Sequence, residues 1–361
     1  MDQDVKHCFL IAFPHITTGE NQYNIGEHWV QADFGYHIRK SLEHVGYKVS
    51  SAIWSTNENC MLVDVKKSLA QLQTQLQTQL QTQFEEHDPV IVVLECNFNI
   101  KENEKLLQLI NAIVFLRNNG ANLKIVTLIP DSWPRNDLLI IVNNVAFSDR
   151  IVLFNEAIIA ILQEKGLDQN IAKKCVYTPI LPIVYRDSSV QQKNIDFCYI
   201  GSSKGYRIMR IGDMMLHRNM NLLIYTAGRE PSEFNLFRHT EDYMKALSYS
   251  KYSILSAITV PRYFRHTNGR LIRAPGQIPG RFAESLATNT IPIYFQEDSF
   301  DTLPSEFENT DCQKPFIIIK SHLRGKEILE FITEHKISTD MIKTFYDKHL
   351  SPNVILSRIM P

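Results

Sequence analysis

"PGRFAESLATNTIPIYF" (residues 279–295) decides the fold class, because it reads as a helix that runs directly into a buried strand. Phe282 and Leu286 form an apolar ridge at helical spacing, and the β-branched and aromatic residues of 290–295 then predict a strand. Arg281 and Glu284 stand three apart at the start of this helix. The helix dipole favours a carboxylate there but not an arginine. We therefore expect the pair to serve something other than the helix.

The same alternation of helix and strand extends outward from this unit. In the second half of the chain, strand patterns occupy 195–201, 220–228, 252–258, 290–295 and 316–320. In the first half they occupy 7–13, 48–54, 88–96, 123–130, 149–155 and 173–181. Continuous β-branched strands that alternate with helices predict parallel sheets. We therefore predict an α/β protein of two Rossmann-like domains that face each other across a cleft.

A change in composition predicts the boundary between these domains. The stretch "TPILPIVYRDSSVQQKN" (178–194) has two prolines followed by a polar segment. We place the boundary there, with an N-terminal domain over 1–183 and a C-terminal domain over 184–361. The last helix of the chain is expected to pack back on the N-terminal domain.

Composition restricts the functional class. The chain has 361 residues and a formal net charge of −1, which argues against nucleic-acid binding by bulk electrostatics but leaves a local basic patch open. Its six cysteines include no CxxC pair, which indicates a reducing compartment. No apolar run is long enough for a signal peptide or a membrane span. We expect a cytoplasmic protein without a membrane partner.

A repeat of Leu, Gln and Thr occupies 68–84, "SLAQLQTQLQTQLQTQF". Its apolar residues recur at helical spacing, so we expect a surface helix whose glutamines face solvent. Contact with a partner helix or aggregation is the alternative. The repeat predicts no function.

Open parallel sheets bind ligands beyond the carboxyl ends of their strands, so unusual residues at those ends are candidates. After the strand at 195–200 comes "IGSSKGYRIMR", a loop of small residues followed by cations. Its amides can approach an anion closely, with the cations over it. The candidate residues are Gly201, Ser202, Ser203, Lys204 and Arg207. A plain Gly/Ser turn is the alternative.

Three further segments of the second half carry cations. The strand at 220–227 ends in Gly228 and Arg229, and the run 260–281 holds five arginines and no acid: Arg262, Arg265, Arg270, Arg273 and Arg281. An acid-free run indicates an anionic ligand, and guanidinium groups suit phosphate. Gly280, Arg281 and Glu284 complete the set, with Glu284 accepting hydrogen bonds from vicinal hydroxyls such as those of a ribose. A buried structural Arg–Glu pair is the alternative. Together these segments favour a nucleotide-diphosphate site.

The first half has to supply an acceptor site and a base. Asp131 directly follows the strand at 123–130 and precedes Trp133, so it could take a proton from an acceptor hydroxyl. An Asp that caps the following turn is the alternative. The loop 14–33 is long for a connection between a strand and a helix, which indicates function. Further catalytic or acceptor-binding candidates are His15, Glu20, Glu27, His28, Asp33 and Trp133.

These segments together resemble the GT-B glycosyltransferases, in which a helix–strand unit like "GRFAESLATNTIPI" binds the donor's ribose and phosphates. Within that class the chain is similar to the phage DNA β-glucosyltransferases. "YIGSSKGYR" resembles their "GGS" loop, whose phosphate-binding arginines fall on Lys204 and Arg207. "TAGRE" resembles their "GNARE" segment. "KIVTLIPDSWPRN" resembles their strand with a catalytic aspartate, which falls on Asp131.

The resemblance implies an enzyme that moves a sugar from a nucleotide-diphosphate sugar, with a UDP-sugar favoured, to an acceptor hydroxyl. The leading acceptor is a hydroxymethylated base in DNA, and a protein, glycan or small-molecule hydroxyl is the alternative. A second alternative is a GT-B module that binds nucleotide sugar without turnover. The chain departs from the phage enzymes in its expanded arginine run and in its lack of net positive charge, which puts a duplex acceptor in doubt.

Two sequence features favour inversion without a metal. The only Asp-x-Asp is Asp2–Asp4 at the N-terminus, so no strand end carries the metal motif of GT-A enzymes. Retaining GT-B enzymes usually carry a second glutamate eight residues before the helix glutamate, where this chain has Gly276. We expect direct displacement with Asp131 as base and no tightly bound metal.

Overall fold

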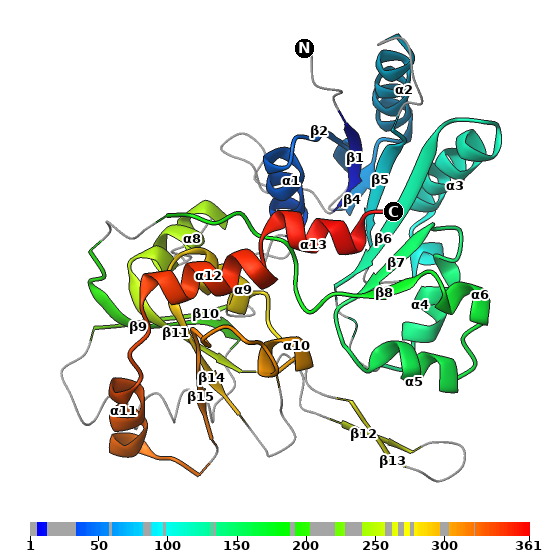
Figure 1. Cartoon of the computed structure of the whole chain (residues 1–361). Helices are drawn as coiled ribbons and strands as arrows, with labels where there is room; N and C mark the ends of the chain where they lie inside the picture. The colour runs from blue at the N-terminus through cyan, green and yellow to red at the C-terminus, as the bar shows by residue number, and fades with distance from the viewer. Residues whose placement is uncertain are drawn as a thin grey trace.

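The structure is a computed structural model, and it describes residues 6–12, 34–57, 60–81, 88–96, 99–130, 132, 135–187, 192–202, 221–227, 240–256, 262–265, 271–274, 278–296, 303–320 and 322–361. These residues form two parallel sheets flanked by helices, and two short hairpins (Figure 1).

The first sheet has six strands in the order β2-β1-β5-β6-β7-β8, all parallel. The strands are β1 (His7–Ile11), β2 (Lys48–Ser51), β5 (Val90–Glu95), β6 (Leu123–Ile129), β7 (Arg150–Leu153) and β8 (Cys175–Tyr177). Its helices are α1 (Phe34–His44), α2 (Val65–Gln81), η1 (Ile100–Glu102), α3 (Glu104–Asn118), α4 (Leu138–Asn144), α5 (Ile158–Glu164) and α6 (Gln169–Ala172). The strand order reverses between β1 and β5, which is the topological switch point of this sheet.

The second sheet has five parallel strands in the order β10-β9-β11-β14-β15. They are β9 (Ile195–Ser202), β10 (Leu222–Ala227), β11 (Ser250–Ser256), β14 (Ile291–Phe295) and β15 (Ile317–Ile319). Its helices are α8 (Thr240–Ser248), α9 (Arg281–Ala287), α10 (Ser305–Glu308), α11 (Gly325–Glu334), α12 (Thr339–His349) and α13 (Pro352–Ile359). In chain order this is the doubly wound 2-1-3-4-5 arrangement, with its switch point between β9 and β11. The predicted α/β class with two Rossmann-like domains is confirmed.

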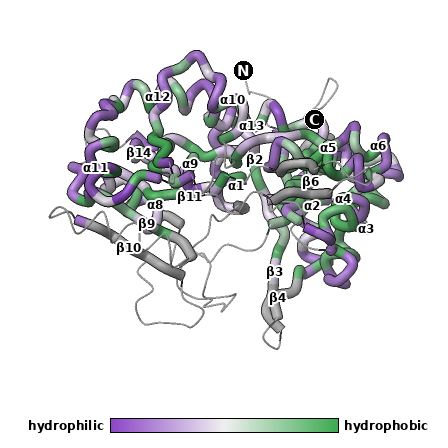
Figure 2. The backbone as a smooth tube through the Cα atoms, turned by 90° about the horizontal axis from the view of Figure 1, so that it is seen from below, coloured by the Kyte–Doolittle hydropathy of each residue, from purple (hydrophilic) through white to green (hydrophobic). Residues whose placement is uncertain are grey.

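Each sheet is covered on both faces, as parallel strands require. Alternate residues of β1 enter different cores: Cys8 and Leu10 pack on one face and Phe9 and Ile11 on the other. One core is shared by the two sheets, because it also takes residues of β9, α8, α9, α12 and α13. Figure 2 shows polar residues gathered on α6 and α11, at opposite ends of the molecule. The shared core makes the two domains one packed body.

Helix α13 returns from the second domain to the first (Figure 1). Ile355, Leu356 and Ile359 are buried in the shared core, and α13 packs against α1. Arg150, the first residue of β7, donates through Nη1 to the carbonyls of Arg358, at 2.9 Å, and of Met360. The chain therefore passes between the domains twice, once through the segment after β8 and once into α13.

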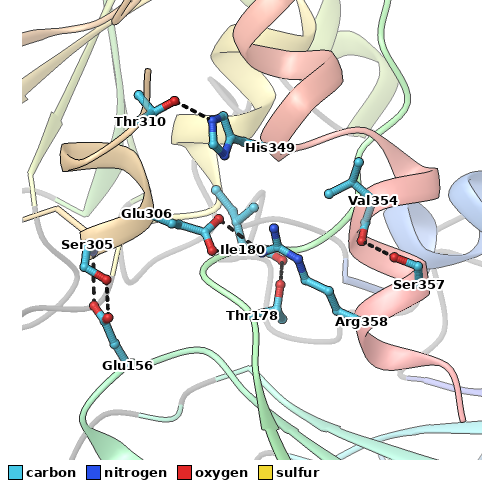
Figure 3. A network of polar contacts seen from close by, with 10 residues as sticks. All are labelled: Glu156, Thr178, Ile180, Ser305, Glu306, Thr310, His349, Val354, Ser357 and Arg358. Carbon is cyan, nitrogen blue, oxygen red and sulfur yellow. Dashed lines mark hydrogen bonds and ion pairs between the residues drawn. The ribbon is translucent and has the colours of Figure 1, made fainter. Parts of the chain in front are cut away.

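A polar network reinforces this second passage (Figure 3). The Glu156 carboxylate, just after β7, accepts a hydrogen bond from the Ser305 backbone N–H at 3.1 Å and another from the Ser305 hydroxyl. Arg358 of α13 pairs with Glu306 of α10 at 2.9 Å. These contacts join the carboxyl edge of the first sheet to the first turn of α10.

Two details differ from the sequence expectations. The predicted strand at 48–54 divides at Ala52: β2 joins the sheet, whereas β3 (Trp54–Asn57) pairs with β4 (Cys60–Val63) as a hairpin. The repeat helix α2 does not turn all its glutamines to solvent, because Gln75 is buried and its Nε2 donates to the Cys8 carbonyl at 3.2 Å. Gln75 lies one turn from the fully buried Leu72 and thus shares its side of the helix.

Candidate functional site

Three helices bring their first turns together between the two domains. His37 is the fourth residue of α1, Tyr243 the fourth of α8 and Glu284 the fourth of α9. Helix α1 follows β1, while α8 and α9 run into the amino ends of β11 and β14. All three helix starts therefore lie toward the carboxyl edges of the sheets, where doubly wound domains hold their ligands.

Glu284 is the centre of this junction. Its side chain has no exposed surface. His37 Nε2 lies 3.0 Å from Oε1, and the Tyr243 hydroxyl donates to Oε2 at 2.6 Å. Both carboxylate oxygens are thus engaged by protein side chains, one from each domain.

The surroundings keep Glu284 ionised. Burial by itself raises the pKa of its carboxyl, but the hydrogen bonds from His37 and Tyr243, aided by the charge of Arg281, outweigh burial, and the pKa lies below its usual 4.5. Burial and the Glu284 charge raise the pKa of Tyr243 well above its usual value, so the phenol keeps its proton and donates it. The site holds a buried anion with matched donors.

Arg281 opens α9 one turn before Glu284, and the two side chains form no ion pair with each other. Arg281 Nε is buried and has no hydrogen-bond partner among the described residues. The alternative of a direct Arg–Glu pair is therefore wrong. Glu284 is satisfied by His37 and Tyr243, whereas Arg281 keeps a buried donor that a ligand could use.

The segment that links the domains passes close to this junction. The Arg186 backbone N–H donates to the Ala287 carbonyl at 2.7 Å, and its Nη2 donates to the Tyr36 hydroxyl at 3.2 Å. Burial lowers the pKa of Arg186, and the Glu284 charge opposes that shift. Arg186 therefore contributes positive charge to the surroundings of Glu284 and ties α9 to α1.

The end of α9 fixes where β14 begins. The Thr290 N–H bonds the Ser285 carbonyl at 2.8 Å and the Asn289 N–H bonds the Leu286 carbonyl at 3.2 Å, with Asn289 at a φ of 58°. These two bonds and the left-handed residue define a Schellman motif. Lys193 donates to the Thr288 carbonyl at 3.2 Å, and burial lowers the pKa of this lysine to about 8. This turn is structural and lies at the end of α9 away from Glu284.

The predicted phosphate loop begins at the switch point of the second sheet. Gly201 and Ser202 are the last residues of β9 and pair in register with Thr226 and Ala227 of β10. Four further donor-site candidates lie in or beside described elements: Gly280 precedes α9, and Arg262, Arg265 and Arg273 lie in strands whose side chains are not described. The remaining donor candidates, Ser203, Lys204, Arg207, Gly228, Arg229 and Arg270, lie outside the described residues.

The arginine run does not form a single loop. Its centre is an antiparallel hairpin of β12 (Arg262–Arg265) and β13 (Leu271–Ala274), in which Tyr263 pairs with Arg273. Figure 1 shows this hairpin extending away from the second sheet. Arg281, in contrast, belongs to α9. The run therefore supplies two separate groups of cations.

The acceptor-side candidates Asp131, Trp133, His15, Glu20, Glu27, His28 and Asp33 all lie outside the described residues. Strand β6 ends at Ile129, and the buried Ser132 is held by its hydroxyl, which donates to the Ile129 carbonyl and accepts from the Phe154 N–H at 3.0 Å. These bonds fix the position of Ser132, the residue that follows Asp131 in the sequence.

Sequence reasoning overlooked three residues of the junction: His37, Tyr243 and Arg186. They carried no signal in the sequence, since their partners lie far away along the chain. Glu95, a half-buried carboxylate that ends β5 at the switch point of the first sheet, was also overlooked, although it closes the buried run "VIVVLE".

Among the described residues, no three His, Cys, Asp or Glu side chains group as metal ligands. Within the same part of the chain, each helix is too short or too polar to cross a bilayer.

The fold and junction define an α/β protein with two doubly wound domains. No protein-family model matches the sequence, and no curated protein sequence matches it either. Among solved structures, the chain is similar to an α,α-trehalose-phosphate synthase (UDP-forming) from Burkholderia vietnamiensis, at 9% identity and a TM-score of 0.45, covering 99% of this chain and 97% of that one.

Two other solved structures are similar over most of their length. One is an α-glucosyltransferase in complex with UDP-glucose and DNA containing an abasic site, at 11% identity and a TM-score of 0.43, covering 80% of this chain and 79% of that one. The other is a sucrose-phosphate synthase from Thermosynechococcus elongatus, at 8% identity and a TM-score of 0.42, covering 97% and 96%. The strand order of the chain itself defines its doubly wound fold.

Proposed function

We propose that the chain is a nucleotide-sugar-dependent glycosyltransferase of the GT-B type. One observation carries this proposal: β9 ends in Gly201 and Ser202 at the switch point of the second sheet, and "SKGYR" follows. Doubly wound sheets bind ligands at this point, and small residues followed by cations suit a diphosphate.

The donor in this proposal is a UDP-sugar. Its diphosphate lies over the Gly201–Gly205 segment, with Lys204, Arg207 and Arg281 as cations. The unpartnered Nε of Arg281 supports its share in this role, because a buried donor without a partner is costly unless a ligand satisfies it. Glu284 is the acceptor of ribose hydroxyls, and the arginines of the β12–β13 hairpin and Arg229 are secondary contacts.

The first domain supplies the acceptor side. Asp131 follows β6 and acts as general base: it takes the proton of the acceptor hydroxyl as that oxygen attacks the anomeric carbon and the nucleotide diphosphate departs. This is an inverting displacement that needs no metal. The leading acceptor is a hydroxymethylated base in DNA, and a protein, glycan or small molecule is the alternative. The loop 14–33 and Trp133 would contact that acceptor.

Calorimetric titration with UDP-, GDP-, CMP- and dTDP-sugars tests the donor assignment, and release of nucleotide diphosphate in the presence of acceptors tests turnover. We expect binding of a UDP-sugar and release of UDP with hydroxymethylated DNA. Binding without release for any acceptor would favour the non-catalytic module. No binding of any nucleotide would overturn the proposal.

A further inference from the structure

We propose that the His37 imidazole occupies the position on Glu284 Oε1 that a hydroxyl group of the nucleotide sugar takes, and that binding of the nucleotide sugar displaces the imidazole. This inference rests on the proposed function, because it takes Glu284 as the carboxylate that receives the donor's hydroxyl groups. It adds a residue of the first domain to a donor site that otherwise belongs to the second.

The contacts of Glu284 support an exchange. A carboxylate only accepts hydrogen bonds, so the imidazole donates its Nε2–H to Oε1 over 3.0 Å, as a sugar hydroxyl would. The Glu284 side chain has no exposed surface, and the His37 side chain is 3% exposed. No ligand can therefore reach Oε1 while His37 stays in place. Tyr243 holds Oε2 from within the second domain and has no need to move.

His37 has room to leave. It lines a pocket of about 490 Å³ between α1, the linking segment and α8, together with Tyr36, Lys40, Arg186 and Met244. This pocket gives the imidazole a space to rotate into. The ring contacts Tyr36 edge-on, with 5.4 Å between centroids. The pocket thus supplies the volume that the exchange requires.

The exchange would couple the donor site to the first domain. The His37–Glu284 bond joins residues 247 positions apart, on α1 and α9. When a donor takes His37's place, this direct bond between the helices is lost while the Arg186 contacts remain. The apparent affinity for the nucleotide sugar is then reduced, because only molecules in which His37 has left Glu284 can bind it.

Titration calorimetry with UDP on four proteins tests the exchange: wild type, His37→Ala, His37→Gln and the control His335→Ala. His335 is exposed just after α11 and does not line the pocket beside His37. We expect His37→Ala to bind UDP about tenfold more tightly than wild type, since a bond to a charged group no longer has to be broken. The Gln amide can still donate to Glu284, so His37→Gln should stay near wild type, as should His335→Ala.

A fifth protein, Glu284→Gln, separates the two proposals. If Glu284→Gln weakens UDP binding but His37→Ala leaves it equal or weaker, the exchange is overturned and the donor role of Glu284 stands. If Glu284→Gln leaves UDP affinity unchanged, the donor role fails and the exchange with it. Thermal unfolding of each variant shows whether it is folded, and His37→Gln serves if His37→Ala is not, because a Gln variant with tenfold altered affinity would also contradict the exchange.

Discussion

The Glu284 carboxylate accepts a hydrogen bond from the Tyr243 hydroxyl at 2.6 Å. This bond joins the first turns of α8 and α9, two neighbouring helices of the same domain. The shared core surrounds both side chains, and the bond helps to keep a carboxylate charged where water does not reach it. Buried charge is tolerated only where such donors are present. The junction is therefore where small chemical changes should have the largest effects.

Removal of this donor should destabilise the protein. Tyr243→Phe keeps the ring but takes one hydrogen bond from a buried carboxylate, which costs about 1.5–3 kcal/mol. The free energy of unfolding in urea measures the loss. Tyr252→Phe is the matched control, because Tyr252 is half-buried and stacks on Phe197. Equal losses in the two variants would contradict the role assigned to the Tyr243 hydroxyl.

Acid should weaken the junction in a defined direction. The folded-state pKa of Glu284 lies below its usual 4.5, so its ionisation stabilises the fold above that value. This contribution is lost as the pH falls through the lower, folded-state pKa. The difference in unfolding free energy between wild type and Glu284→Gln should be constant near neutral pH and shrink below pH 4.5. A difference that grows in acid would show that the pKa is raised instead.

Replacement of Asn289 by glycine should raise the stability of the fold. It stands at a φ of 58°, is 6% exposed, and neither polar atom of its amide has a hydrogen-bond partner among the described residues. Asn289→Gly removes both buried polar atoms and suits the left-handed conformation, so it should stabilise the fold by about 1 kcal/mol. Asn289→Ala removes the same atoms but keeps a Cβ at positive φ, so it should be less stable than the glycine variant. Thermal unfolding of the pair checks the order.

Asp131→Asn tests the chemistry. Loss of a general base lowers turnover about 10²–10⁴-fold while donor binding persists. UDP release and UDP titration measure the two quantities separately. Full activity in this variant would move the base to Glu27, His28 or Asp33, or to Glu95.

The salt dependence of acceptor binding identifies its class. Contacts to DNA phosphates release counterions, so the affinity for a DNA acceptor should fall steeply as salt is raised. Titration of a hydroxymethylated duplex across a range of salt concentrations measures this slope, with the unmodified duplex as control. An affinity independent of salt would favour the protein, glycan or small-molecule acceptor.

The sequence predicted the sheets well because a buried parallel strand is a local signal. The runs that became β5, β6 and β9 are almost wholly apolar over five or more residues. The hairpins were missed because β3 and β12 each have four residues of mixed polarity, and their pairing is what makes them strands.

The sequence singled out Glu284 because it follows Arg281 by three residues at the start of a helix, and its role in donor binding stays a prediction. Its partners were not singled out, because periodicity shows which side of a helix is buried but not what it meets 247 residues away. Gln75 was misjudged for the same reason: only the fold reveals a backbone carbonyl within its reach.

The return of α13 means that the first domain is unfinished until α13 has been made. A fragment that ends before β9 would expose the apolar surface that Ile355, Leu356 and Ile359 cover. It would also deprive the Arg150 guanidinium of two carbonyl acceptors, those of Arg358 and Met360. A single cut in the linking segment, in turn, would leave both pieces held by α13 and the shared core. During synthesis, the surface of the first domain therefore stays incomplete until α13 has been made.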